Sequence, residues 1–283
     1  MNRREFIFGG LGAAAMAGCR CPLCGGSNVR LAMAGYTLHR FKTDEALAFC
    51  EKHGFRYLCV KDMHLPLSAK PAEIAAFRRK CADHGVTPYG VGPIYMYTED
   101  EAKRSFDYAA ELGVGVMSGV PTERYGDKKL RANRKLCELV SDLAAKYDLR
   151  FAIHNHGRNP ETGSPELFAA LPETWEIIRD LDPHVGFCVD WAYTYADGLD
   201  CVEMARTYAS RIYDGHVRCL SDAKNGSSGV NPAKRTFDYD AIFAALKEIG
   251  YDGCLGLELA NAFPDNVQWI DESRDYFERM IAQ

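Results

Sequence analysis

The segment Arg150-Phe151-Ala152-Ile153-His154-Asn155-His156-Gly157 joins a short apolar run to two histidines and a glycine. An apolar run that ends in polar residues is typical of a buried strand whose C-terminal end opens into a site. Taken alone, the histidines fit an ordinary role as hydrogen-bonded residues at the edge of a loop. Three later segments have the same construction, and together they favour a shared functional site.

Short apolar strands alternate with helices along most of the chain. Besides the opening segment, strands are predicted at Leu31–Tyr36, Tyr57–Val60, Thr87–Gly92, Val114–Met117, Val185–Asp190, Arg211–Val217 and Gly253–Glu258. Helices are predicted at Asp44–His53, Pro71–His84, Thr98–Leu112, Asp127–Tyr147, Pro172–Leu181, Cys201–Ser210 and Tyr239–Ile249, with a last helix that starts at Asp265. Eight such units over about 250 residues predict an α/β fold, a single (β/α)8 TIM barrel, over residues 30–283. An open doubly wound sheet is less favoured, because no glycine-rich phosphate turn follows the first strand.

The composition excludes several classes of protein. The chain has 283 residues, of which 47% are hydrophobic and 26% charged, as in ordinary globular proteins. The formal net charge is −5 and there is no basic block, so nothing indicates a nucleic-acid partner. The body of the chain has no apolar run long enough to span a membrane. The sequence does not distinguish a monomer from a homo-oligomer.

The N-terminus has the pattern of an export signal. Residues 1–18 contain the pair Arg3-Arg4 followed by a small and apolar run, which predicts a twin-arginine-type signal peptide. Residues 19–29 are predicted to be a linker. The sequence Met16-Ala17-Gly18-Cys19 is similar to a bacterial lipobox, in which Cys19 would carry a lipid anchor; the alternative is cleavage near Ala17. Both interpretations predict a periplasmic protein or one anchored at the cell envelope.

Eleven cysteines are present, and in an exported protein they would be exposed to an oxidising compartment. Three lie in the leader and linker: Cys19, Cys21 and Cys24. The other eight sit singly within apolar strands and helices, where cysteine behaves as a small hydrophobe. They are Cys50, Cys59, Cys81, Cys137, Cys188, Cys201, Cys219 and Cys254. This usage suits a protein that folds in a reducing compartment before export.

Ligand-type side chains end four consecutive predicted strands: His154, Asp190, His216 and Glu258. In a closed barrel the C-terminal strand ends meet at one mouth, where the chemistry of this fold is found. Two imidazoles and two carboxylates form a mixed nitrogen and oxygen site for a divalent metal such as Mn²⁺, Co²⁺, Zn²⁺ or Mg²⁺. Single residues of this kind often cap helices, but four at equivalent positions favour a metal site.

Four motifs carry a resemblance to a known family: Lys61–Pro66, Ile153–Gly157, Gly186–Asp190 and Leu257-Glu258. With them the chain resembles the xylose isomerase-like TIM barrel superfamily, the sugar phosphate isomerase/epimerase family, and in particular exported bacterial members. The resemblance covers about Leu31 to Glu258. It implies that His154, Asp190, His216 and Glu258 ligate one divalent metal, with Mn²⁺ favoured.

The chain departs from the family pattern near the expected substrate. Many members have Glu where His154 stands. Tyr193 and Ala196 replace a His and an Arg that usually follow the strand-end Asp. Arg218 keeps the charge of a usual Lys after the strand-end His, but Cys219 replaces the Asp. The expected metal ligands are retained, whereas the residues expected to contact the substrate differ from the family pattern. The family pattern therefore predicts the metal site but does not define the substrate class.

This ligand set predicts abstraction of a proton next to a substrate carbonyl, giving an enediolate held by the metal. Reprotonation of this enediolate at the neighbouring carbon would make the protein a sugar isomerase, and reprotonation on the other face would make it an epimerase. Loss of a β-substituent would instead make it a lyase or hydratase of keto-sugar glycosides. We predict Glu258 as the base, with His156 or His64 as a second proton-transfer group. Epimerising relatives use two metal-bound carboxylates, one on each face of the substrate. With His154 in place of the first, this chain keeps one of that pair, Glu258, so the lyase remains an alternative.

Substrate contacts are predicted for five residues that flank these strand ends: Lys61, His64, Trp191, Tyr193 and Arg218. Lys61 and His64 would bind hydroxyl groups, or else form a salt bridge and a hydrogen bond at a helix start. Trp191 and Tyr193 would stack on a sugar, and Arg218 would hold a carboxylate or phosphate. The expected partner is a small carbohydrate, neutral or oxidised.

Two other functions remain as alternatives. A non-catalytic sugar-binding barrel is compatible with the altered residues after Asp190 and His216. A metal-dependent phosphodiesterase acting on abasic DNA uses the same barrel. The acidic composition, the export signal and the single ligand set all disfavour the phosphodiesterase.

Overall fold

The computed structural model describes residues 29–125, 129–157, 167–218, 239–259 and 267–283. The predicted signal peptide, linker, Cys19, Cys21 and Cys24 lie outside these residues and stay predictions. So do Cys219 and the predicted start of the last helix at Asp265. Among the described residues, no helix has the length and apolar character that crossing a bilayer requires.

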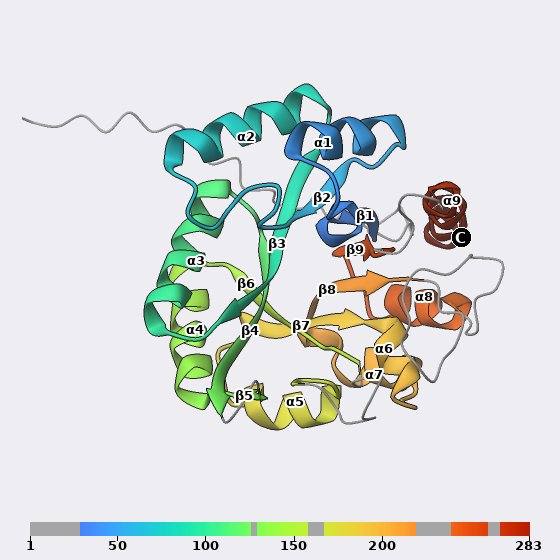
Figure 1. The fold of residues 1–283 in the computed structure, drawn as a ribbon. Helices are drawn as coiled ribbons and strands as arrows, with labels where there is room; N and C mark the ends of the chain where they lie inside the picture. The colour runs from blue at the N-terminus through green and yellow to red at the C-terminus, as the bar shows by residue number, and fades with distance from the viewer. Residues whose placement is uncertain (1–28, 126–128, 158–166, 219–238, 260–266) are drawn as a thin grey trace, which may run out of the picture.

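Eight parallel strands of the described chain close into a barrel (Figure 1). They are β1 (Arg30–Ala34), β2 (Tyr57–Val60), β3 (Thr87–Met96), β4 (Val116–Tyr125), β6 (Arg150–His154), β7 (Val185–Asp190), β8 (Ile212–Val217) and β9 (Cys254–Leu257). Each strand pairs with the next, and β9 pairs with β1, with Arg30 opposite Cys254. The prediction of a closed (β/α)8 barrel is therefore confirmed.

Helices surround the barrel (Figure 1). They are α1 (Thr43–Lys52), α2 (Pro71–Asp83), α3 (Glu99–Leu112), α4 (Arg134–Tyr147), α5 (Leu171–Ile178), α6 (Trp191–Ala196), α7 (Cys201–Thr207), α8 (Tyr239–Glu248) and α9 (Gln268–Ala282), with short 3-10 turns at Gly35–Leu38 and Ala209–Arg211. The sequence explains their ends. Thr98 accepts a hydrogen bond from the Glu101 amide at 3.2 Å, and the Glu101 carboxylate accepts one from the Thr98 amide at 3.0 Å. The two hydrogen bonds form a capping box at the start of α3.

The structure corrects the helix predicted over Asp127–Tyr147. The helix begins at Arg134, and Lys129–Ala132 forms β5, which pairs antiparallel with the end of β4. Asn133 starts the helix by accepting a hydrogen bond from the Leu136 amide at 3.1 Å. β4 accordingly runs well past the predicted end at Met117.

Alternate residues of each strand face the barrel interior. On β7 these are Gly186, Cys188 and Asp190, whereas Phe187 packs outward against Tyr208 at a ring distance of 5.1 Å. Gly186 lies near the N-terminal end of β7, close to the 3-10 turn that precedes β8: a Cβ there would be 2.1 Å from the Arg211 carbonyl oxygen. β7 and the start of β8 are therefore packed tightly at the end of the barrel opposite the expected site.

Replacing Gly186 with Ala is expected to lower the free energy of unfolding by about 1–3 kcal/mol, because the backbone at Arg211, just before β8, must move to admit a methyl group. Chemical denaturation followed by circular dichroism would measure the loss. Gly115→Ala is the matched control, since a Cβ at Gly115 meets nothing within 4 Å. Equal stability of the two variants would contradict the tight packing.

Candidate metal centre

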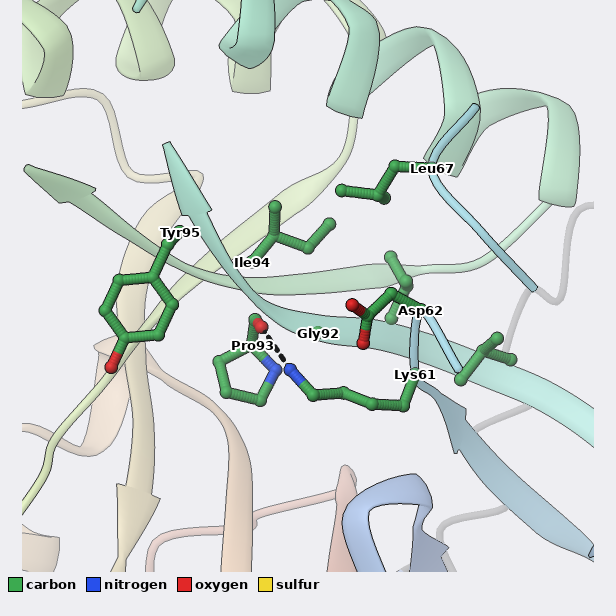
Figure 2. A pocket seen from close by; sticks show the side chains of 9 residues that line it. Lys61, Asp62, Leu67, Gly92, Pro93, Ile94 and Tyr95 are labelled. Atoms are coloured by element: carbon green, nitrogen blue, oxygen red, sulfur yellow. Dashed lines mark hydrogen bonds between the residues drawn. The ribbon is translucent and has the colours of Figure 1, made fainter. Parts of the chain in front are cut away.

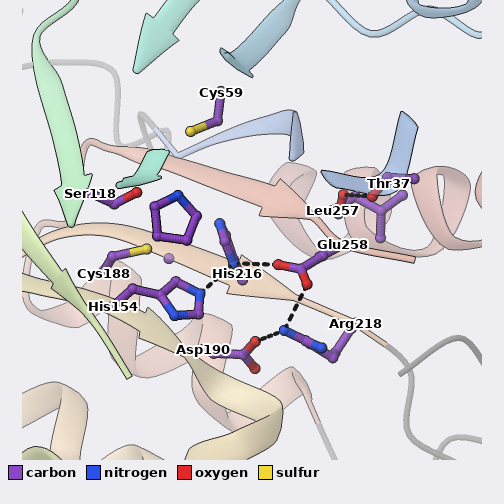
Figure 3. A network of polar contacts seen from close by, with 12 residues as sticks. Thr37, Cys59, Ser118, His154, Cys188, Asp190, His216, Arg218, Leu257 and Glu258 are labelled. Atoms are coloured by element: carbon purple, nitrogen blue, oxygen red, sulfur yellow. Dashed lines mark hydrogen bonds and ion pairs between the residues drawn. The ribbon is translucent and has the colours of Figure 1, made fainter. Parts of the chain in front are cut away.

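Four strand ends bring His154, Asp190, His216 and Glu258 together at the C-terminal end of the barrel (Figure 3). We call these residues the mouth set. One ligand atom from each lies within 4.8 Å of the ligand atoms of the other three. His154, Asp190 and His216 are almost fully buried, and the Glu258 side chain is 12% exposed. The strands place together the four side chains that the sequence nominated.

The spacing of these atoms suits one metal ion. Nε2 of His154 lies 2.9 Å from Nδ1 of His216, which lies 2.8 Å from Oε2 of Glu258. Ligand atoms that each bind a metal at about 2.0–2.1 Å lie roughly 3 Å from one another. The mouth set therefore fits a divalent metal in both chemistry and spacing, and these four residues would hold it.

A side-chain amide that sequence reasoning did not use fixes the position of Asp190. Oδ1 of Asn155 accepts a hydrogen bond from the Asp190 amide at 2.7 Å, and Nδ2 of Asn155 donates to Oγ1 of Thr194 at 3.3 Å. Oδ1 of Asp190 also caps α6 by accepting from the Ala192 amide at 3.1 Å. The central position of Asn155 in the His-Asn-His triplet was the available signal.

Hydrogen bonds from Thr37 fix the backbone on either side of Glu258. Oγ1 of Thr37 donates to the Leu257 carbonyl and accepts from the Leu259 amide, each at 2.9 Å. The Glu258 amide donates to the Val217 carbonyl at 3.0 Å. The backbone of Glu258 is thus tied on both sides, which limits the positions that its carboxylate reaches.

Arg218 lies within the site, as predicted, but its partners there are protein carboxylates. Its guanidinium forms an ion pair with Oδ2 of Asp190 and a second, at 3.2 Å, with Oε1 of Glu258. The side chain is 1% exposed and its Cζ lies 4.3 Å from the centre of the Tyr193 ring. Arg218 therefore places a buried positive charge beside both carboxylates of the mouth set (Figure 3).

These charges set the protonation of the site. Burial alone would raise the pKa of Glu258, but Arg218 and His216 outweigh it and hold the pKa well below its usual range. Burial lowers the pKa of His154 well below its usual value, and His156 and His216 act in the same direction. Burial also lowers the pKa of His156 to about 4. At neutral pH, Glu258 is ionised and the imidazoles of His154 and His156 are uncharged.

His156 and Lys61 face the space beside the mouth set. Nε2 of His156 is 3.3 Å from the Tyr95 hydroxyl, and its ring centre is 4.7 Å from that of His154. Nζ of Lys61 donates to the Pro93 carbonyl at 2.6 Å. Lys61 and Tyr95 line a cavity of about 220 Å³ between the ends of β2 and β3 (Figure 2).

Two predicted substrate contacts have structural roles instead. Trp191 is fully buried, so its ring offers no face on which a sugar would stack, and that prediction is corrected. His64 is 4% exposed and its Nε2 donates to the Leu38 carbonyl at 3.1 Å. The alternative predicted for His64 is a hydrogen bond at a helix start, whereas its partner Leu38 ends the short 3-10 turn Gly35–Leu38. Tyr193 is partly buried and packs against Arg218.

The xylose isomerase-like TIM barrel family model matches residues 47–280. The chain belongs to this family. The curated relatives include the inosose isomerases of Bacillus velezensis, 24% identical over 242 residues, and of Bacillus subtilis, 23% identical over 233 residues. These alignments cover 79% and 75% of this chain, and 85% and 82% of the relatives.

Solved structures share the barrel of this xylose isomerase-like protein. D-psicose 3-epimerase, crystallised with D-fructose, has a TM-score of 0.70 at 15% identity and covers 89% of this chain and 99% of its own. The IolI protein with a bound zinc atom has a TM-score of 0.68 at 21% identity, over 89% of this chain and 98% of its own. At these identities the likeness shows the fold.

Replacing Arg218 with Met is expected to lower the free energy of unfolding of the metal-free protein by about 3–5 kcal/mol, because two buried carboxylates lose their counter-charge. Denaturant titration in the presence of a chelator would measure it. The control is Arg206→Met, which breaks an ion pair with Glu248 on the exposed surface and should change stability little. A similar small effect in both variants would contradict the role given to Arg218.

Proposed function

We propose that this protein is a divalent-metal-dependent sugar isomerase or epimerase that removes a proton next to a substrate carbonyl. The observation that carries the proposal is the mouth set, whose donor atoms lie at the mutual spacing of metal ligands. Membership of the family and the isomerase relatives support the reaction class. Mn²⁺ is the proposed metal, with Co²⁺, Zn²⁺ and Mg²⁺ as the other candidates for this donor set.

A divalent metal, when bound, polarises a substrate carbonyl and makes the neighbouring C–H group more acidic. Glu258 is the proposed base, because its carboxylate is ionised at neutral pH and its backbone is fixed by Thr37 and Val217. Because the backbone on either side of Glu258 is held by hydrogen bonds, its carboxylate has few alternative positions, and little conformational entropy is lost when it accepts a proton. Arg218 holds the opposite side of that carboxylate in place.

His156 is proposed as the second proton-transfer group. Its imidazole is uncharged at neutral pH, since its pKa is about 4, and its Nε2 lies near the Tyr95 hydroxyl. An uncharged imidazole has one nitrogen that accepts a proton and one that donates, so it suits movement of a proton between neighbouring carbons. Lys61, in the adjoining cavity, would bind substrate hydroxyl groups.

A keto-sugar glycoside lyase is the second candidate, and one observation favours it. Arg218 pairs with both carboxylates of the mouth set, but Asp190 also caps α6, so Glu258 is the carboxylate that remains for base catalysis. β-Elimination needs one base, whereas epimerisation needs proton transfer at both faces of the same carbon. Release of the β-substituent from a keto-sugar glycoside would identify this reaction.

The proposed setting is the cell envelope, either periplasmic or anchored through Cys19. The twin-arginine pattern at Arg3-Arg4 and the lipobox-like sequence that ends at Cys19 support it. A twin-arginine route carries folded proteins, so the metal would be acquired before export.

Glu258→Gln is expected to slow exchange of the substrate α-proton with solvent deuterium by roughly 10²–10⁴-fold, because the amide does not accept the proton. Proton NMR of a panel of neutral and oxidised ketoses in deuterium oxide, at saturating Mn²⁺ and with metal content measured, would follow the exchange. Glu272→Gln on the exposed surface of α9 is the control. Exchange at the wild-type rate in metal-loaded Glu258→Gln would remove Glu258 from its role.

Removing the metal is a separate test. Treatment with a chelator is expected to abolish α-proton exchange, and Mn²⁺ is expected to restore it, because an unpolarised carbonyl leaves the C–H group too weakly acidic. Exchange that survives in protein shown by elemental analysis to be metal-free would refute metal dependence. Sugar binding without exchange, measured by calorimetry on the metal-loaded protein, would point to the non-catalytic barrel.

A further inference from the structure

A thiol lies directly beneath the mouth set. Cys188 precedes Asp190 by two residues on β7, so both side chains face the barrel interior, with Cys188 one layer deeper. In the register of the sheet, Cys188 pairs with His154 on one side and with Asp214 on the other. Its side chain is fully buried.

The thiol forms a second donor set with both histidines of the mouth. One ring nitrogen of His154, one of His216 and Sγ of Cys188 all lie within 4.8 Å of one another. We call these three residues the deep set. Imidazole with thiolate is a donor combination that favours Zn²⁺ and other thiophilic cations over Mg²⁺ or Mn²⁺, which prefer oxygen ligands.

The histidines carry ring nitrogens that the mouth set leaves over. Nδ1 of His154 and Nε2 of His216 are buried and have no hydrogen-bond partner among the described residues. A histidine that binds a metal through one nitrogen almost always donates the other N–H group to a carboxylate, carbonyl or water. These two nitrogens lack such partners. When no cation occupies the mouth position, each imidazole can carry its proton on the other nitrogen, and these buried nitrogens can then offer lone pairs to a second cation.

The carboxylates of the mouth set already have a counter-charge. Arg218 pairs with both Asp190 and Glu258. Consider the group formed by a divalent cation in the mouth set, Arg218 and the two carboxylates. Its net charge is one positive charge. The same cation bound to a Cys188 thiolate makes the whole group neutral. Lys61 and Asp214 lie close by and have opposite charges, so they do not change this comparison.

We propose that the deep set is a second position for a thiophilic divalent cation such as Zn²⁺. On binding, the Sγ–H bond of Cys188 breaks, a bond from sulfur to the cation forms, and the proton passes by way of Asp214, whose Oδ2 lies 3.6 Å from Sγ, to solvent, so that Asp214 stays ionised. An uncharged imidazole has one free lone pair, so His154 and His216 serve one position at a time. The proposal uses two residues of the proposed metal centre but does not depend on the proposed reaction.

Cobalt spectroscopy of the full-length protein tests the deep set. We expect a near-ultraviolet charge-transfer band from thiolate to Co²⁺ in the wild type and its loss in Cys188→Ser. Cys137→Ser, a buried thiol on helix α4 outside the barrel, is the matched control and should keep the band. Zinc dissociation constants should rise roughly tenfold or more in Cys188→Ser, with manganese changing by less than about threefold.

Two results would overturn the proposal: Co²⁺ bound without the band in the wild type, or a band that persists in Cys188→Ser. If that variant does not fold, ¹¹³Cd NMR of the wild type decides, because a thiolate ligand moves the cadmium resonance far from that of nitrogen and oxygen ligands. Wild-type protein that binds neither ion would refute both metal positions. A thiolate band without α-proton exchange would support the deep set and refute the proposed reaction. α-Proton exchange without a thiolate band would support the proposed reaction and refute the deep set.

Discussion

A guanidinium buried between two carboxylates holds the mouth of this barrel together. Arg218 follows β8, and its partners Asp190 and Glu258 end β7 and follow β9, so one charge joins three neighbouring strands. Removing three charged groups from water is costly, and the arrangement is stable only while each charge keeps its partners. The ionisation of Glu258 depends on this contact, and the same guanidinium packs against the ring of Tyr193.

The parallel barrel explains why much of the site was predictable from sequence. Strands that run in one direction bring their C-terminal ends to one face, so a polar residue at each apolar strand end belongs to that face. This reasoning placed His154, Asp190, His216 and Glu258 together without any knowledge of contacts. It requires only that each strand end be located to within a residue, and short apolar runs such as residues 150–154 meet that requirement.

The failures have physical causes of a different kind. Residues Lys129–Ala132 were assigned to a helix because the apolar stripe of α4 follows directly, and an antiparallel partner on β4 is invisible to local periodicity. Trp191 was expected at the substrate because it follows a ligand, yet Asp190 caps α6 and turns the indole into the core. Cys188 was taken as a small hydrophobe. Its place one layer below Asp190 and beside His154 follows from strand register, which sequence patterns do not give.

His154 stands where many members of the family that the chain resembles have a carboxylate. The candidate metal centre therefore has one negative charge fewer. With imidazole at this position, the carboxylates of the mouth set are two, and Arg218 offsets one of them permanently. A divalent cation then retains more of its positive charge than it would among three carboxylates, which strengthens its pull on a substrate carbonyl and favours an anionic product of proton loss. On the two proposals above, a Cys188 thiolate would relieve this excess of positive charge, so a cation in the deep set would polarise a carbonyl less strongly than one in the mouth set. The oxygen donors of the mouth set favour Mn²⁺ or Mg²⁺ and the sulfur donor of the deep set favours Zn²⁺, so the identity of the cation would decide which position it occupies.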